Sequence, residues 1–169
     1  IPKITVLFIS NTLLFVYSKP NLLQKYYRLD KIKSYDADYN IIIGERSNGK
    51  TYSVLEEILA HCLKTGRKAG VIRRYREDYR GKRGPSLFSA HVANGLVEKL
   101  SGGTWDSVYY YSNRWYFARS YEDEKTGGIK LEKADEPFCY AFALSDVEHD
   151  KSTSYPPSSF TILELKYIY

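Results

Sequence analysis

Two glycines separated by four residues, and followed at once by Lys and Thr, occur in the segment Gly44-Glu45-Arg46-Ser47-Asn48-Gly49-Lys50-Thr51. Glycine adopts backbone torsions that other residues avoid, so successive amide groups of such a segment can turn inward around an anion. A helix that begins near Lys50 adds the partial positive charge of its N-terminus. The pattern therefore predicts a phosphate-binding loop between a strand and a helix.

Two side chains of this loop have specific roles in ATP binding. We expect the Lys50 ammonium to reach the β- and γ-phosphates, and the Thr51 hydroxyl to bind the Mg²⁺ that bridges them. The other expected contacts are backbone groups along the loop. The full set of expected cofactor-binding residues is Gly44, Glu45, Arg46, Ser47, Asn48, Gly49, Lys50 and Thr51. The alternative is a glycine-rich turn that matches the pattern by chance.

The residues on both sides of the loop predict the strand and the helix that the motif requires. Residues 39–43 form a short apolar run, rich in β-branched side chains, which is typical of a buried parallel strand. After the loop, apolar residues recur at helical spacing as far as Gly66, a glycine suited to ending a helix. These apolar residues are Val54, Leu55, Ile58, Leu59, Cys62 and Leu63.

The rest of the chain predicts an α/β fold with a mainly parallel sheet, flanking helices and an added β-hairpin. Residues 68–75 are expected to form a second strand that completes a β-α-β unit. The other expected elements are one helix over 85–100 ended by Gly102-Gly103, an aromatic hairpin over 108–118 with its turn at Ser112-Asn113, and strands over 138–144 and 160–169.

Composition bounds the class of protein. The 169 residues, 43% of them hydrophobic, suffice for one domain with a core. Two cysteines, Cys62 and Cys139, are too few for a metal or disulfide framework, which favours packing roles and a reducing compartment. The apolar runs before Tyr17 fall short of the roughly 20 residues that span a bilayer. We expect residues 1–21 to be a leader or a segment added by cloning, and no membrane partner.

Positive charge is concentrated in residues 67–83. This segment has eight basic and two acidic residues, a net charge of +6, whereas the whole chain has +5. Nucleic-acid phosphates are one possible partner, and water around an exposed loop is the other. The sequence leaves both open.

The order of several segments resembles the DNA-packaging (encapsidation) ATPase of φ29-like bacteriophages. The resemblance covers about residues 22 to 162. Because many nucleotide-binding proteins share the glycine-rich loop, the ordered combination of segments is what makes it specific. These segments are residues 39–51, Val71-Ile72-Arg73-Arg74-Tyr75, the aromatic hairpin, and Leu144-Ser145 through Lys151-Ser152 to Tyr155-Pro156, followed by Thr161-Ile162.

This resemblance implies an ASCE-type P-loop NTPase domain over residues 22–169, incomplete at its C-terminal end, in a motor that couples ATP hydrolysis to movement of double-stranded DNA. It further implies a homo-oligomeric ring, expected to be a pentamer, which meets the portal (connector) and packaging RNA of the procapsid. The implied location is the host cell cytoplasm, with transient attachment to the portal vertex. Arg46 stands where related ATPases have an arginine that approaches the γ-phosphate, which makes it a candidate catalytic residue beside Lys50. Lys151 is a candidate contact at a subunit boundary.

The chain departs from this family at the acidic pair that holds Mg²⁺ and polarises water. Where the family has an apolar strand ending in Asp-Glu, this sequence has Leu165 and Lys166. Glu164 can take the role only if the strand shifts by one residue, which also turns its neighbours to the opposite face. Glu164 is therefore the third candidate catalytic residue, and Thr51 is the predicted metal ligand.

Two other functions fit the same residues. A P-loop kinase or nucleotide-binding regulator would use the basic segment to hold a phosphorylated substrate, without moving DNA. A non-enzymatic assembly module would respond to nucleotide without hydrolysing it, which the missing acidic pair allows. Stimulation of ATP turnover by DNA would distinguish the motor from both.

Overall fold

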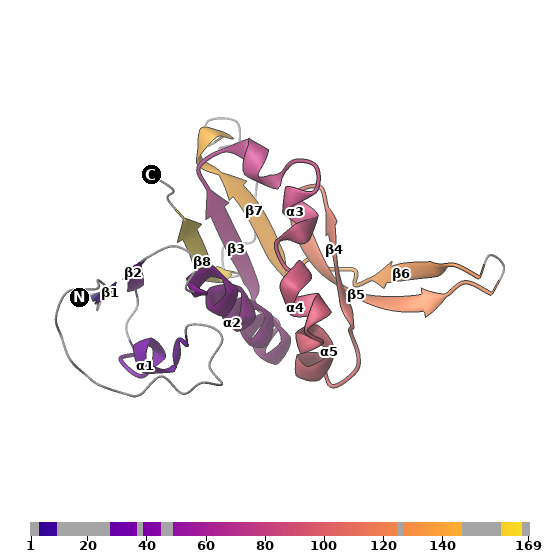
Figure 1. Cartoon of the computed structure of the whole chain (residues 1–169), viewed down its shortest axis with the longest axis horizontal. Coiled ribbons are helices and arrows are strands. Elements are labelled where there is room, and N and C mark those ends of the chain that lie inside the picture. The colour runs from indigo at the N-terminus through magenta and orange to yellow at the C-terminus, as the bar shows by residue number, and fades with distance from the viewer. Residues whose placement is uncertain are drawn as a thin grey trace. The chain divides into compact units, whose positions relative to one another are not determined.

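The computed structural model describes residues 4–9, 28–36, 39–44, 49–124, 127–146 and 160–166. The chain divides into two compact units, Ile1–Glu56 and Glu57–Tyr169. Figure 1 shows the helices and strands of each. Together these elements make a mixed α/β protein, as the sequence predicts.

A two-stranded parallel sheet forms in the first unit. β1 (Ile4–Ile9) pairs with β2 (Tyr39–Gly44) along its whole length. Between them in sequence lies α1 (Asp30–Lys33), whose Ile32 side chain is buried. The parallel strand predicted before the glycine-rich loop is thus confirmed, and it ends at the first glycine of that loop. The prediction that it is buried is wrong, because the Ile41 side chain is 46% exposed.

The helix predicted after the loop is α2 (Lys50–Thr65). Gly66 follows it with a φ of 70° and donates its amide to the Cys62 carbonyl at 2.9 Å, so this glycine ends the helix as predicted. One stripe of the helix is buried, which confirms the helical spacing of its apolar residues. The buried apolar side chains are Leu55, Ile58, Leu59 and Cys62.

The second unit is built on a six-stranded mixed sheet in the order β4-β5-β7-β3-β8, with β6 paired to β5. β3 is parallel to β7 and to β8, whereas β4, β6 and β7 are all antiparallel to β5. The parallel part of this sheet is therefore limited to β7-β3-β8, so the prediction of a mainly parallel sheet is wrong. The predicted β-α-β unit is also wrong among the described residues, because β2 pairs with β1 in a separate sheet and β3 pairs with β7 and β8. The strands are β3 (Lys68–Arg73), β4 (Ser107–Tyr111), β5 (Arg114–Glu122), β6 (Ile129–Lys133), β7 (Cys139–Ala143) and β8 (Phe160–Lys166).

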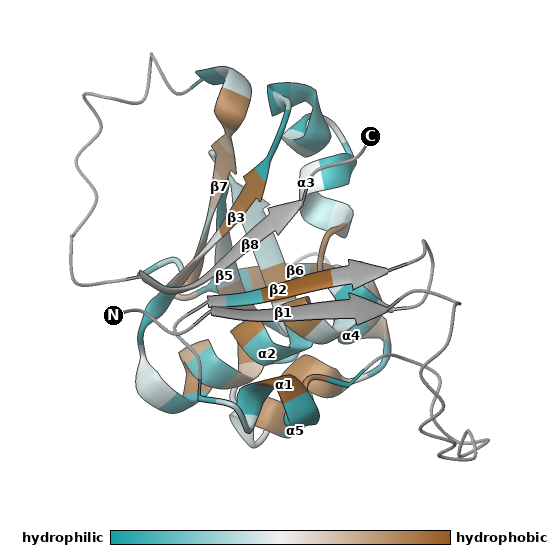
Figure 2. Ribbon diagram, turned by 90° about the vertical axis from the view of Figure 1, so that its left-hand side faces the viewer, coloured by the Kyte–Doolittle hydropathy of each residue, from teal (hydrophilic) through white to brown (hydrophobic). Residues whose placement is uncertain are grey.

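Three short helices replace the single helix predicted over 85–100. That prediction is wrong because the helical path breaks twice, first at Leu87 and Phe88 and then at Gly95, which adopts a left-handed φ of 66°. Gly102, also left-handed, ends the last helix as predicted. Figures 1 and 2 show these helices on one face of the sheet. The helical segments are η1 (Arg76–Tyr79), α3 (Arg83–Ser86), α4 (Ser89–Ala93), α5 (Leu96–Ser101) and, after β7, η2 (Leu144–Asp146).

The predicted aromatic hairpin is confirmed as β4 and β5. Its two turn residues, Ser112 and Asn113, have φ values of 49° and 60°. Positive φ at both central residues is the type I′ geometry, whose twist matches that of the two strands. The hairpin therefore follows from its turn chemistry as well as from its aromatic strands.

Trp115 of this hairpin is the centre of the core. Its side chain is fully buried, and its indole Nε1 donates a hydrogen bond to the Gly84 carbonyl at 3.0 Å. Phe88 and Tyr79 meet the indole edge-on, with ring centroids 5.7 and 5.8 Å away. These contacts fasten η1, α3 and the chain before α4 to the sheet.

Both cysteines are buried thiols, which agrees with the packing roles that the sequence predicts. Cys62 Sγ lies 3.6 Å from the Phe138 carbonyl oxygen, to which it donates. Burial raises the pKa of the Cys62 thiol to about 12, and the nearby Lys68 ammonium opposes this shift only in part. Cys62 is therefore protonated at neutral pH, which suits a packing residue and not a nucleophile.

We expect Gly84→Ala to lower the free energy of unfolding by about 1–3 kcal/mol, because the site has no room for a methyl group. A Cβ atom at this position would lie 2.5 Å from a Tyr110 ring carbon and 2.6 Å from the Tyr79 carbonyl oxygen. Urea unfolding measures the change. Ser86→Ala, an exposed position in the same short helix, should shift stability by no more than about 0.5 kcal/mol. Equal stability of the two variants would contradict this account of the core.

Candidate functional site

The glycine-rich segment joins β2 to α2. β2 ends at Gly44, and Gly49 and Lys50 begin the helical side of the connection. Gly49 has a φ of 85°, a conformation that residues with a side chain rarely adopt. A strand, a left-handed glycine and a helix start thus follow one another along the chain in the order that the sequence motif predicts.

The first turn of α2 brings Lys50 and Thr51 together, both half-buried. Ser53 closes this turn, since its amide donates to the Gly49 carbonyl at 3.0 Å and its hydroxyl donates to the same oxygen at 3.3 Å. The turn has no acidic side chain of its own, so no carboxylate within it opposes the partial positive charge at the start of this 16-residue helix. The first turn therefore offers an anion a positive helix end beside a lysine.

Of the predicted site residues, the structure describes Gly44 at the end of β2, and Gly49, Lys50 and Thr51 at the start of α2. Glu45, Arg46, Ser47 and Asn48 lie outside the described residues, as does Lys151. The predicted catalytic role of Arg46 therefore stays a prediction. Thr51, in the first turn, is at the position that the motif assigns to the Mg²⁺ ligand.

Glu164, the third candidate catalytic residue, belongs to β8 in the second unit. It lies opposite Val71 of β3, and the next two residues of β8 lie opposite Ile72 and Arg73. The register of this strand pair shifts near its start, because Lys68 is opposite Phe160 whereas Ala69 is opposite Ile162. One residue of β8 is thus extra, which is the signature of a bulge.

The carboxyl ends of β3 and β7 are tied together by a cluster that the sequence analysis did not identify. The Ser145 amide donates to the Arg74 carbonyl at 3.1 Å, and the Arg76 amide donates to Ser145 Oγ at 3.2 Å. The Arg76 guanidinium pairs with Asp146 at 3.3 Å. Ligands of open α/β sheets bind at the carboxyl ends of parallel strands, so this edge is a second candidate site. Only the alignment of strand ends in a parallel sheet could have indicated it.

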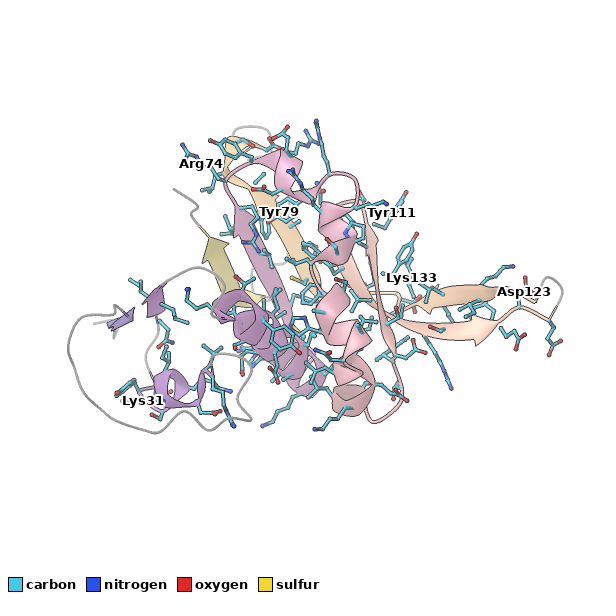
Figure 3. The ribbon with its side chains drawn as sticks, viewed as in Figure 1. Lys31, Arg74, Tyr79, Tyr111, Asp123 and Lys133 are labelled. Carbon is cyan, nitrogen blue, oxygen red and sulfur yellow. The ribbon has the colours of Figure 1, made fainter. Side chains whose placement is uncertain are left out.

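The basic segment 67–83 has both structural and exposed parts. Arg73 is buried at the end of β3, and Lys68 pairs with Glu136 at 3.5 Å. The basic side chains beyond the strand are exposed, and Figure 3 shows Arg74 at this end of β3. In Figure 2 the colour changes from brown on β3 to teal on the chain that follows it. The exposed basic side chains of this chain segment are Arg74, Arg76, Arg80, Lys82 and Arg83.

The described parts of the chain have neither a metal-ligand cluster nor a membrane-spanning helix. There, no three His, Cys, Asp or Glu side chains are grouped as they would be around a metal ion. Over the same ranges, every helix is too short or too polar to cross a bilayer. Neither finding bears on a cation held chiefly by phosphate oxygens and Thr51.

Comparisons of the chain with models of protein families, with curated proteins and with solved structures gave no match.

Proposed function

We propose that this chain is the nucleotide-binding part of an ATPase that moves double-stranded DNA into a viral procapsid. The observation that supports it most is the junction of β2 and α2, where a left-handed Gly49 with φ 85° precedes a helix that begins at Lys50. The glycine-rich motif predicts this local geometry from eight residues. The DNA-packaging part of the proposal is based on the resemblance of the ordered segments to φ29-like packaging ATPases.

Each group at the junction would have a separate role in binding ATP. Backbone amides between Gly44 and Gly49 would surround the phosphates, and Lys50 would balance the charge of the β- and γ-phosphates. Thr51 would hold the cation through its hydroxyl oxygen. When bound, Mg²⁺ would neutralise the negative charge that develops on the transferred phosphoryl group. A P-loop NTPase fold of the ASCE type is the finer proposal for the α/β architecture.

Glu164 is our proposed carboxylate for orienting the attacking water. The family position of the acidic pair falls on Leu165 and Lys166, and neither side chain can accept a proton from water. Glu164 is the acidic residue of β8, one position before Leu165, and it lies opposite Val71 of β3. Arg46 is proposed to stabilise charge on the γ-phosphate from the same chain.

The proposed contact with DNA is the exposed part of the basic segment. Arg80, Lys82 and Arg83 are exposed and close in sequence, and the acidic residue paired with one of them is Glu77, 3.6 Å from Arg80. Exposed pairs of this kind are weak, so DNA phosphates can displace Glu77 at little cost. Phosphate contacts give affinity without reading base sequence, which suits a motor that moves any DNA.

We expect Lys50→Ala to weaken ATP binding about 10- to 100-fold, because one charge-assisted contact with phosphate is lost. The melting temperature should change little. Nucleotide titration and thermal unfolding measure the two effects. Lys64→Ala removes an exposed lysine from the last turn of the same helix and should leave both unchanged. An unaltered affinity of the Lys50 variant would refute the phosphate-binding assignment.

We expect Glu164→Gln to lower the rate of phosphate release about 100-fold or more while ATP affinity is retained, since the amide cannot take a proton from water. Steady-state phosphate release with a parallel binding titration separates the two parameters. Glu98→Gln, on the exposed side of α5, is the matched control. Equal turnover in both variants would exclude Glu164, and absence of turnover in the unmodified chain would favour the nucleotide-responsive assembly module.

The triple variant Arg80→Ala, Lys82→Ala and Arg83→Ala should flatten the slope of log DNA affinity against log salt concentration by up to about 0.9 per lost phosphate contact. The measurement needs the assembled ring with an ATP analogue, because DNA contacts of a motor form in its assembled state. A control triple variant, Lys31→Ala, Lys64→Ala and Lys99→Ala, removes the same charge at exposed positions of three other helices. An equal slope for both variants would mean that the exposed basic side chains contact solvent, or the portal and its RNA, and not DNA. DNA that leaves ATP turnover unstimulated would favour the kinase or regulator.

A further inference from the structure

The second half of β5 and the whole of β6 form an arm that projects from the second unit. Ala118 to Glu122 pair with Lys133 to Ile129 in antiparallel register. All five residues of β6 are exposed, and the Ile129 side chain is 81% exposed. Figure 1 shows the arm extending away from the helices, and Figure 3 places Asp123 near its tip and Lys133 near its base. The arm thus presents both faces and one strand edge to its surroundings.

The outer edge of β6 is unpaired among the described residues, since β5 is the one strand that pairs with it there. At the base of the arm the Ala134 amide donates to the Phe117 carbonyl, and at its tip the Asp123 amide donates to the Gly128 carbonyl. Backbone groups of successive residues point to alternate sides of a strand. Ile129, Leu131 and Lys133 therefore direct their N–H and C=O groups to the outer edge.

The sequence of β6, Ile129-Lys130-Leu131-Glu132-Lys133, is complementary to itself when a second copy runs antiparallel. With Leu131 opposite Leu131 of the second copy, each Lys130 faces a Glu132, and each Ile129 faces the aliphatic stem of a Lys133. Opposite charges and apolar pairs directly across two strands are stabilising. One register thus satisfies charge and hydrophobicity at every position of the strand.

The inner strand extends this charge pattern. Arg119 of β5 lies opposite Glu132, and in the proposed pairing the Lys130 of the second copy follows in the same row. Each Glu132 therefore lies between two cations of the same face, of which Lys130 also pairs with Asp123 of its own arm. On the other face, Ser120 lies opposite Leu131, so the two leucines meet at the centre of a four-stranded sheet. A shift of the second strand by two residues would place Lys130 opposite Lys130 or Glu132 opposite Glu132, which disfavours those registers.

We propose that the outer edge of β6 is an interface between two copies of this chain, in which the two β6 strands pair antiparallel about a two-fold axis at Leu131. Six backbone hydrogen bonds are expected, two at Leu131 and two at each pair of Ile129 with Lys133. This contact is isologous, so it differs from the head-to-tail contacts that build a ring. It does not rest on the proposed nucleotide site, and failure of either leaves the other intact.

Charge exchange provides the first test. Lys130→Glu places like charges opposite each other twice in each dimer, and Glu132→Lys does so with the opposite sign. Each variant alone should dissociate at about tenfold higher concentration than the unmodified chain in sedimentation equilibrium. An equimolar mixture of the two should associate again, because each substituted residue then faces an opposite charge. Recovery on mixing separates loss of the interface from damage to the arm, which mixing cannot repair.

Matched controls are available on α5. Lys99→Glu and Glu98→Lys change the net charge by the same amounts at exposed positions away from the arm. They should leave the dissociation constant unchanged. Association that neither arm substitution weakens would place the interface on another surface and overturn the proposal. An unmodified chain that stays monomeric at all concentrations would do the same and leave this edge to a strand of another protein.

Cysteine cross-linking tests the register itself. In the proposed pairing the Cα atoms of position 131 are about 5.5 Å apart, within the range of a disulfide. Those of position 129 are about 14 Å apart, because the two lie four residues out of register. Leu131→Cys should therefore form a covalent dimer under mild oxidation faster than Ile129→Cys, although Ile129 is the more exposed of the two. The native thiols are buried and do not compete. Faster cross-linking at position 129 would mean random collision and would rule out this register.

Discussion

The hydrogen bond from the Trp115 indole to the Gly84 carbonyl is the interaction on which the second unit depends. A fully buried indole N–H without an acceptor would lower the free energy of unfolding by about 1–3 kcal/mol, so an acceptor such as a carbonyl oxygen must lie at this point. Gly84 can do so because the Tyr110 ring and the Tyr79 carbonyl occupy the space that a Cβ atom would need. The close approach of backbone to aromatic rings thus requires glycine here for reasons of space.

This interaction also determines where the basic segment lies. Tyr79, packed edge-on against Trp115, has its hydroxyl 2.7 Å from the Val71 carbonyl oxygen and 3.2 Å from that of Phe142. η1 is therefore held across the ends of β3 and β7, and Arg76 pairs there with Asp146. The exposed arginines that follow extend from a firmly packed support. An exposed charge on such a support loses less side-chain and backbone entropy on binding a phosphate than one on a mobile loop.

Local signals in the sequence predicted those elements whose cause is local. The apolar spacing of α2 and the turn residues Ser112 and Asn113 were sufficient for a helix and a hairpin. The prediction of a single helix over 85–100 was wrong because it relied on the helical spacing of the apolar residues and ignored Gly95, which interrupts that spacing with a left-handed conformation. β6 was missed because its residues are exposed on both faces, and strand prediction depends on one buried face. The start of α2 at Lys50 was predicted from a motif. The contact of Ser145 with Arg74 joins segments distant in sequence, so no local pattern could predict it.

In the proposed pairing, the charges of the arm restrict its strand edge to one pairing geometry instead of preventing pairing altogether. Edge strands commonly avoid pairing by presenting lysines, whose charges repel a second copy. In β6 the central lysine and the central glutamate are two residues apart on the same face, so repulsion arises in shifted or parallel registers and attraction in one antiparallel register. Ile129 and Leu131, exposed on the opposite face, add apolar area to the pairing. The charges of β6 therefore have two effects in the proposed pairing. They protect the edge from general aggregation, and they select the antiparallel register with Leu131 opposite Leu131.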